Sequence, residues 1–318
     1  MSLTPECGGG AFRRTREMNE MPKALINHVN LHYHVTGRGV PIVFVHPPLL
    51  TSAVFNYQKA ELSESCKVIT FDIRGHGWSG RSEAPLSYDL IAEDMKQLLD
   101  HLNIEKAYVC GYSAGGGIAL HAMMQHPDRF MGGILLSAMS EVIDRRLRSQ
   151  IRMVAGLMRL RLERLANMAL SWGNKDSAQT FRNLYKSAKR GDRRNILEYF
   201  NLSLTYNCTK QLSRIKQPVL LVYGQKNRSF YRYAEILHHN LPASSLYFMR
   251  GVGHQLPTKA GDRVNRLIMR WLEMQGAVDT DADRTAPPLK EETDREPVHP
   301  AALGKEWHEE LVHSRRDL

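Results

Sequence analysis

The sequence has few cysteines and no long apolar run. Its four cysteines contain no C-x-x-C pair, so neither a zinc site nor a disulfide framework is predicted. No stretch of about 18 uninterrupted apolar residues occurs, and stable insertion into a membrane is therefore not expected. Arginines near the start of the chain are followed by no apolar core, which argues against a secretory signal. Together these absences predict a cytoplasmic protein.

Charge is distributed unevenly along the chain. The 318 residues carry a formal net charge of +10, and 42% of them are hydrophobic, enough for one large domain with an insertion or for two domains. Residues 1–21 are polar and contain three consecutive glycines, which predicts a flexible tail. Residues 277–318 have a net charge of −5 and are rich in Pro, Asp, Glu and Thr, which predicts a disordered acidic tail.

Between the tails, short apolar runs alternate with segments of helical periodicity. Residues 26–35, 42–45, 67–71, 108–111 and 132–138 have the character of strands, and residues 88–102 and 114–125 that of helices. The alternation resumes at residue 218 with two more strands and two more helices. This order predicts an α/β fold in which a mostly parallel sheet is covered by helices on both faces, formed by residues 22–140 and 218–276.

One strand of this pattern ends in a serine turn. Residues 111–115 read Gly-Tyr-Ser-Ala-Gly, between an apolar run and a helical segment. A nucleophilic serine needs a sharp, exposed turn above the strand ends, and Gly111 and Gly115 remove the side chains that would clash there. The amide of Ala114 opens a helix, where it can face a developing oxyanion. The other interpretation is a glycine-rich turn with a capping serine; the flanking strand and helix favour Ser113 as a nucleophile.

Residues 141–217 interrupt the alternation with helical periodicity throughout. Residues 145–216 contain 17 Lys or Arg and four acidic residues, a net charge of +13. Apolar residues trace one face of the first helical segment and arginines trace another, which predicts a basic amphipathic helix. Either this helix is an ordinary one with a solvated arginine face, or its arginines face an anionic substrate or surface. No stacked aromatic residues or recognition-helix motif accompany the arginines, so binding to nucleic acid is not expected.

Five stretches together resemble the α/β-hydrolase superfamily: residues 44–46 (Phe-Val-His), 72–79 (Asp-Ile-Arg-Gly-His-Gly-Trp-Ser), the serine turn, 219–224 and 251–254 (Gly-Val-Gly-His). They occur in the family's order, and only the two tails lie outside the resemblance. It implies that Ser113 is the nucleophile, that His254 is its general base, and that residues 141–217 form a helical cap. A serine hydroxyl needs such an imidazole to take its proton.

Two positions depart from the family's pattern. The triad aspartate is replaced by Asn227, which can accept a hydrogen bond but cannot stabilise an imidazolium by charge. The loop that supplies an oxyanion donor reads His46-Pro47-Pro48, and Pro48 has no N–H to donate, although the N–H of Leu49 could substitute. Glu141, just beyond the neighbouring strand, is a substitute for the missing acid, and its other interpretation is a helix cap. We therefore hypothesise that Glu141, and not Asn227, orients His254.

The combined pattern predicts a serine hydrolase that cleaves a carboxylic ester or thioester of a small molecule through an acyl-enzyme. No metal or organic cofactor is expected. The main alternative is a non-enzyme that uses this fold to bind a small molecule, because Asn227 and Pro48 have weakened the catalytic machinery. Hydrolysis of a carbon–carbon bond, lactone opening and perhydrolysis use the same triad and stay open. An anionic acyl substrate is expected if the arginines of residues 145–216 line the cap, and the oligomeric state is not predicted.

Overall fold

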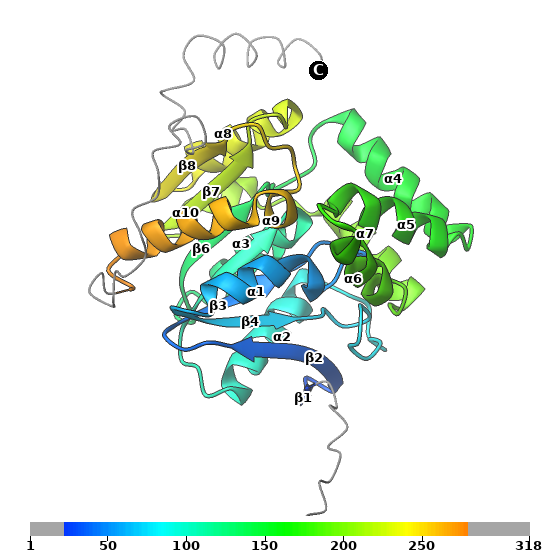
Figure 1. Ribbon diagram of the computed structural model, residues 1–318, viewed down its shortest axis with the longest axis horizontal. Helices are drawn as coiled ribbons and strands as arrows, with labels where there is room; N and C mark the ends of the chain where they lie inside the picture. The colour runs from blue at the N-terminus through cyan, green and yellow to red at the C-terminus, as the bar shows by residue number, and fades with distance from the viewer. Residues whose placement is uncertain (1–21, 279–318) are drawn as a thin grey trace, which may run out of the picture.

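An eight-stranded sheet forms the centre of the molecule (Figure 1). The computed structural model describes residues 22–278, so the predicted tail 1–21 and residues 279–318 of the predicted tail 277–318 lie outside the described residues. Ala277 and Val278, the first two residues of that predicted tail, pack against the core. The strand order is β1-β2-β4-β3-β5-β6-β7-β8, and every pairing from β4 to β8 is parallel. The strands are β1 (Lys23–Ile26), β2 (Val29–Thr36), β3 (Val40–Val45), β4 (Cys66–Phe71), β5 (Ala107–Tyr112), β6 (Phe130–Leu136), β7 (Val219–Gly224) and β8 (Ser244–Met249).

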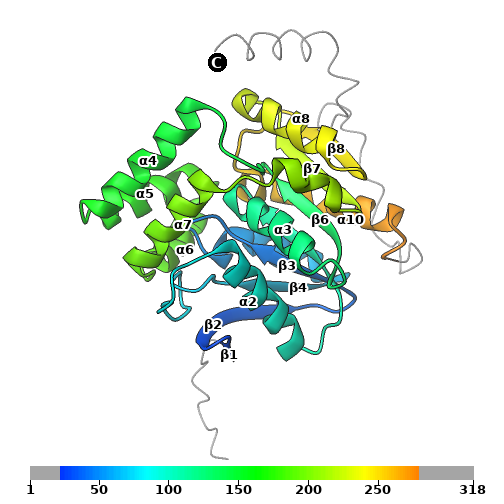
Figure 2. The ribbon, with the colours of Figure 1, turned by 180° about the vertical axis from the view of Figure 1, so that it is seen from behind.

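Helices cover both faces of this sheet, as the sequence predicts (Figures 1 and 2). One face carries α2 (Tyr88–His101), α3 (Ala114–Gln125) and α8 (Tyr231–Asn240), and the other carries α1 (Asn56–Leu62), α9 (Leu256–Lys259) and α10 (Gly261–Met274). Within β3, Val43 and Val45 enter the first core, whereas Ile42 and Phe44 enter the second. Because both faces are buried, the parallel strands are continuous apolar runs rather than alternating ones.

The first part of the described chain contains one strand and one α-helix more than predicted. The single alternating stretch 26–35 is in fact the second half of an antiparallel hairpin, because β1 pairs with β2 through a turn at Asn27 and His28. Both turn residues have positive φ (45° and 63°), which is the geometry of the tight turns that join antiparallel strands. The helix α1 was not predicted, since its seven residues are too few for a clear helical period.

Four α-helices and one 3₁₀ helix follow β6 before the chain returns to β7: α4 (Arg145–Arg159), α5 (Glu163–Asn174), α6 (Ala178–Ala188), α7 (Arg193–Thr205) and η2 (Thr209–Arg214). We call residues 141–217 the helical insertion. Figures 1 and 2 show it in green, beside the carboxyl ends of the strands. Its side chains bond to the strand ends and to the loops that follow them. Tyr199 Oη donates to His46 O (3.0 Å), and Asn174 Oδ1 accepts from Oη of Tyr112, the last residue of β5 (3.1 Å). Ser187 Oγ accepts from Thr51 Oγ1 (2.8 Å), and Asn195 Oδ1 accepts from the amide of Ser82 (2.9 Å).

Candidate active site

Ser113 lies at the sharp turn between β5 and α3. Its backbone has φ +53° and ψ −122°, a conformation that costs a non-glycine residue about 1–3 kcal/mol and persists only where the surroundings enforce it. Here the amide of Ser113 donates to the carbonyl of Leu136 in β6 (2.9 Å). A Cβ at Gly111 would collide with the backbone of Gly116, and one at Gly115 with the carbonyl of Val45. The glycines thus allow α3 to start directly against the strand ends.

His254 reaches Ser113 from the loop after β8. Its Nε2 lies 3.0 Å from Ser113 Oγ, within hydrogen-bond distance. The carbonyl of His254 accepts a bond from the hydroxyl of Ser137 (3.1 Å), a residue with φ +47° at the end of β6. Sequence reasoning missed Ser137; its only signal is a polar residue directly after a buried apolar strand.

Asn227 occupies the other side of the imidazole. Its Nδ2 lies 2.9 Å from Nδ1 of His254, and its Oδ1 accepts a longer bond from the hydroxyl of Ser229 (3.3 Å). Backbone bonds bring the two loops together, because the amide of Lys226 donates to the carbonyl of Val252 (2.8 Å). The position that Asn227 fills is the one that a triad acid would take.

The orientation of the Asn227 amide decides which nitrogen of His254 carries the proton. If Nδ2 donates to Nδ1, the neutral ring carries its proton on Nε2 and donates to Ser113, which is the wrong tautomer for a general base. If the amide turns by 180° about Cβ–Cγ, Oδ1 accepts from Nδ1–H, and Nε2 is free to accept the serine proton. An aspartate offers only acceptor oxygens and therefore has no such second orientation.

The environment of His254 favours its neutral form. Burial lowers the pKa of its imidazole from 6.5 to about 4. The ring packs against Phe230 (ring centroids 4.5 Å apart) and Tyr112 (5.6 Å). Within residues 22–278, no carboxylate bonds to either ring nitrogen, so nothing offsets the cost of desolvating the charged form.

Glu141 does not meet His254. One of its carboxylate oxygens accepts from Asn207 Nδ2 and the other from Thr209 Oγ1, both at 2.7 Å. The loop after β6 is held in this direction because the carbonyl of Ser140 accepts from the amide of Cys208 (3.1 Å). The hypothesis that Glu141 orients His254 therefore finds no support in this geometry. Nor is Glu141 the helix cap, since Asp144 caps α4 through the amide of Leu147 (2.6 Å).

A small pocket separates Glu141 from the serine turn. Three of its lining residues are apolar or glycine and five carry a hydroxyl or carboxyl group: Tyr88, Ala114, Gly117, Met139, Ser140, Glu141, Ser203 and Tyr206. Because Ala114 follows the serine, this pocket lies beside the nucleophile, and no arginine lines it. Two of its members, Ser203 and Tyr206, come from the end of the helical insertion and were not predicted as site residues.

The candidate oxyanion donors are the amides of Ala114 and Leu49. In the described part of the chain, neither amide donates to a backbone carbonyl. Leu49 is buried and has φ +68°, whereas Pro48 beside it has no N–H. The preceding His46 is fixed by its two ring nitrogens, since Nε2 accepts from the amide of Ile73 (2.9 Å) and Nδ1 bonds to the carbonyl of Pro47 (2.9 Å).

Asp72 braces the neighbouring loop. Its carboxylate bonds to His32 Nδ1, to the amide and hydroxyl of Ser52 and to the amide of Trp78, at 2.7–2.9 Å. Burial raises the pKa of Asp72, but the hydrogen bond from His32 and the nearby charges outweigh it and lower the pKa to about 2. This carboxylate is therefore ionised and fully engaged away from His254.

Comparison with known proteins places this geometry in a family. A family model described as the alpha/beta hydrolase fold matches residues 40–257. The chain is 28% identical to the AB hydrolase superfamily protein YisY of Bacillus subtilis (strain 168) over 256 residues, covering 77% of this chain and 96% of that protein. It is 26% identical to the serine hydrolase BPHL of Homo sapiens over 260 residues, covering 79% and 86%.

Solved structures show the same architecture. The esterase EaEST from Exiguobacterium antarcticum superposes with a TM-score of 0.72 at 18% identity, covering 79% of this chain and 98% of that one. At this identity the likeness shows the fold alone. The family match, however, spans more than half of the chain and includes the serine turn and His254, so the chain belongs to the α/β-hydrolase family.

Proposed function

We propose that this protein is a serine hydrolase that cleaves a carboxylic ester or thioester of a small molecule through an acyl-enzyme. The observation that carries the proposal is the 3.0 Å contact between Ser113 Oγ and His254 Nε2 at a strained turn between a strand and a helix. The chain's similarity to a protein named a serine hydrolase supports the same chemistry. Because relatives with this fold are named hydrolases, we expect this chain to be an enzyme as well.

Each residue has a defined part in the proposed reaction. His254 Nε2 takes the proton of Ser113 as Oγ attacks the carbonyl carbon, and the resulting oxyanion faces the amides of Ala114 and Leu49. His254 then returns the proton to the leaving alcohol or thiol. A water molecule, deprotonated by His254, releases the acid from Ser113. In that last step His254 returns the proton taken from water to Ser113 Oγ. The two abstractions, from Ser113 and from water, require Nε2 to be unprotonated beforehand, so Asn227 must present Oδ1 to Nδ1–H.

The helical insertion is proposed to act as the cap of this site. Its bonds to the carbonyl of His46, directly after β3, and to the hydroxyl of Tyr112, directly before Ser113, anchor it to the strand ends at the site. Ser203 and Tyr206 place its last helix and the turn after it at the pocket beside Ala114. No arginine lines that pocket, so its lining does not itself favour an anionic acyl group. Selection of an anionic acyl substrate by the arginines of the insertion stays a prediction.

A second function is favoured by Asn227. An amide at the position of the acid leaves the imidazolium without a counter-charge, so the same site could acylate and then stall, acting as a slow binding protein. Carbon–carbon hydrolysis, lactone opening and perhydrolysis also remain compatible with these residues. Acylation and deacylation separate the first two functions: a working hydrolase releases the acyl group on every turnover, whereas a binding protein releases at most one equivalent of leaving group.

The test is covalent labelling with a fluorophosphonate probe. The wild-type protein should be labelled once, and Ser113→Ala should abolish the label. Ser140→Ala is the matched control, because Ser140 lines the adjacent pocket but makes no contact with His254, and this variant should keep the label. Equal labelling of Ser113→Ala would refute the nucleophile. A single burst of p-nitrophenol from p-nitrophenyl acetate without turnover would favour the binding protein.

A further inference from the structure

The α4–α5 hairpin exposes an unusual share of the molecule's apolar side chains. Nine large hydrophobic residues are exposed within residues 22–278, and six of them lie in this hairpin. Leu160 is 71% exposed and Trp172 62%, far more than a side chain that packs on the core. The six are Met153, Leu160, Leu162, Leu165, Met168 and Trp172, and we call them the apolar strip.

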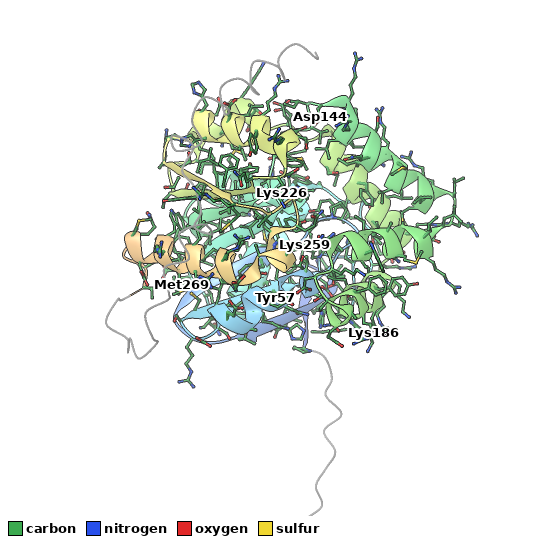
Figure 3. All side chains as sticks on the ribbon, turned by 45° about the horizontal axis from the view of Figure 1, so that its top comes forward. Tyr57, Asp144, Lys186, Lys226, Lys259 and Met269 are labelled. Carbon is green, nitrogen blue, oxygen red and sulfur yellow. The ribbon has the colours of Figure 1, made fainter. Side chains whose placement is uncertain are left out.

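Within each helix, the exposed apolar residues share a face. Leu165, Met168 and Trp172 are spaced three and four residues apart, so they lie on one face of α5. Met153 and Leu160 are seven residues apart and share a face of α4 and its cap. The two helices meet at Arg161, whose φ of +61° turns the chain tightly between Leu160 and Leu162. Figure 3, in which Asp144 marks the beginning of α4, shows side chains projecting outward from the helices on this side.

Positive charge surrounds the strip. Six arginines of the hairpin are exposed: Arg145, Arg146, Arg152, Arg159, Arg161 and Arg164. Within residues 22–278, none of them pairs with a carboxylate; Arg159 bonds only to the neutral amide of Asn201 (3.2 Å). The carboxylate of Glu163, in their midst, lies instead 3.6 Å from Arg193 of α7. The hairpin therefore presents apolar side chains between uncompensated cations.

We propose that the α4–α5 hairpin binds the surface of an anionic lipid bilayer. Leucine, methionine and tryptophan side chains interleaved with arginine suit the boundary of an anionic bilayer. The apolar side chains can contact the acyl chains, and the arginines can bind the negatively charged headgroups. A second copy of the chain would place arginines against arginines, and an acidic polypeptide would leave the apolar strip without an apolar partner. No helix among the described residues is long and apolar enough to span a bilayer, so the binding is peripheral.

The proposal is tested by sedimentation of the full chain with vesicles. Phosphatidylcholine vesicles containing about 30% phosphatidylserine should bind the protein at least about tenfold more strongly than phosphatidylcholine alone, because each arginine near such a surface adds electrostatic attraction. Binding should weaken as salt rises, since the Debye length falls from about 10 Å at 0.1 M to about 3 Å at 1 M.

Charge-reversal and leucine-to-serine variants, each with a matched control, test whether the α4–α5 hairpin is the surface that binds the vesicles. Arg161→Glu with Arg164→Glu should lower binding about tenfold or more, whereas Arg38→Glu with Lys106→Glu, an equal charge change at exposed positions elsewhere, should lower it much less. Leu162→Ser with Leu165→Ser should also weaken binding, and Leu25→Ser, at an even more exposed site on β1, should not. Thermal unfolding of each variant checks that it folds.

Tryptophan fluorescence gives a second readout. Brominated acyl chains should quench the wild-type protein on vesicles, and Trp172→Phe should lose most of the quenching that binding adds. Absence of vesicle binding, equal binding to neutral and anionic vesicles, or equal loss with the charge pair placed elsewhere would each overturn the proposal. A wild-type dimer that becomes monomeric in Leu162→Ser with Leu165→Ser, and binds no vesicles, would assign the strip to self-association instead.

Discussion

Asn227 holds its side-chain amide 2.9 Å from Nδ1 of His254, at the position where the reaction requires an acceptor. The bond orders the ring, but an amide cannot supply the negative charge that stabilises an imidazolium. The histidine that would act as base is therefore correctly placed, but no negative charge beside it stabilises its protonated form. This single relationship governs the first three predictions.

Replacing Asn227 with aspartate should accelerate the enzyme. A carboxylate accepts from Nδ1–H in either orientation and stabilises the charge on His254, and the reverse replacement in a serine protease costs about 10⁴ in turnover. We expect kcat/KM on a p-nitrophenyl ester to rise by two or more orders of magnitude. Asn227→Ala serves as the control, and it should be slower than wild type because it leaves Nδ1 without a partner. An unchanged rate in Asn227→Asp would show that the acid position does not limit the reaction.

Removing the charge of Glu141 should matter little. Its oxygens are occupied by Asn207 and Thr209, and it has no bond to His254. We therefore expect Glu141→Gln to change kcat/KM by less than about tenfold on the same ester, and to change the probe-labelling rate equally little. A loss approaching 10⁴ would restore Glu141 as the residue that orients His254.

The pH profile should report the buried imidazole. Burial lowers the pKa of His254 to about 4, and the base acts only when neutral, so kcat/KM should stay high as pH falls and drop only near pH 4. In Asn227→Asp the added negative charge favours the imidazolium and raises this pKa, so the drop should move to higher pH. Measuring kcat/KM of both proteins from pH 3.5 to 8 (about ten points) checks the direction. A drop already near pH 6.5 in the wild type would contradict the effect of burial.

The free energy of unfolding should decrease at acidic pH because of the same ionisation of His254. His254 has a lower pKa in the folded chain than the 6.5 of an unfolded one, so the unfolded state binds more protons between pH 6.5 and about 4. Its contribution should therefore become more destabilising as pH falls through that window and be absent above it. His254→Gln should flatten this part of the dependence when the free energy of unfolding is measured by urea denaturation. An identical slope in the variant would assign the acid sensitivity to other groups.

Restoring an N–H at position 48 tests the oxyanion hole. If the amide of Leu49 is the donor, Pro48→Ala should change kcat/KM by less than about tenfold. If Pro48 occupies the donor position, the same substitution should raise turnover by about 10²–10³, which is the usual effect of one oxyanion-hole donor on kcat. Thermal unfolding should accompany the assay, because both prolines of this loop are buried.

Breaking a buried ion pair near the site should cost far more than breaking an exposed one. The guanidinium of Arg74 forms two bonds to the carboxylate of Asp94, one of them 2.6 Å long, and both side chains are buried. Asp94→Asn leaves a buried charge without its counter-charge, so we expect a loss of about 3–5 kcal/mol in unfolding free energy. The exposed pair of Arg81 and Glu83 is the control, and Glu83→Gln should cost at most about 1 kcal/mol. Similar losses in both variants would refute the role assigned to burial.

Local chemistry in the sequence determined much of this protein. The glycines around Ser113 encode the sharp turn, because any side chain there would collide with neighbouring backbone. The apolar run before the turn predicts β5, and the helical period after it predicts α3. The presence of an amide at residue 227 and of a proline at residue 48 are facts of composition that need no structure. The alternation of strand and helix, read along the chain, predicted a parallel sheet covered on both faces, and this is the observed fold.

Tertiary structure alone decided which groups meet. Asn227 faces His254, and Glu141 does not, because backbone bonds join the loops after β7 and β8, while the loop after β6 is tied to the insertion through Ser140 and Cys208. These directions depend on bonds between segments far apart in the chain, which no local pattern records. The same holds for α4 and α5. Helical spacing predicted one basic amphipathic helix at the beginning of the insertion, yet α4 ends at Arg159, the chain turns at Arg161, and Leu162 and Leu165 of the next helix and its cap are exposed.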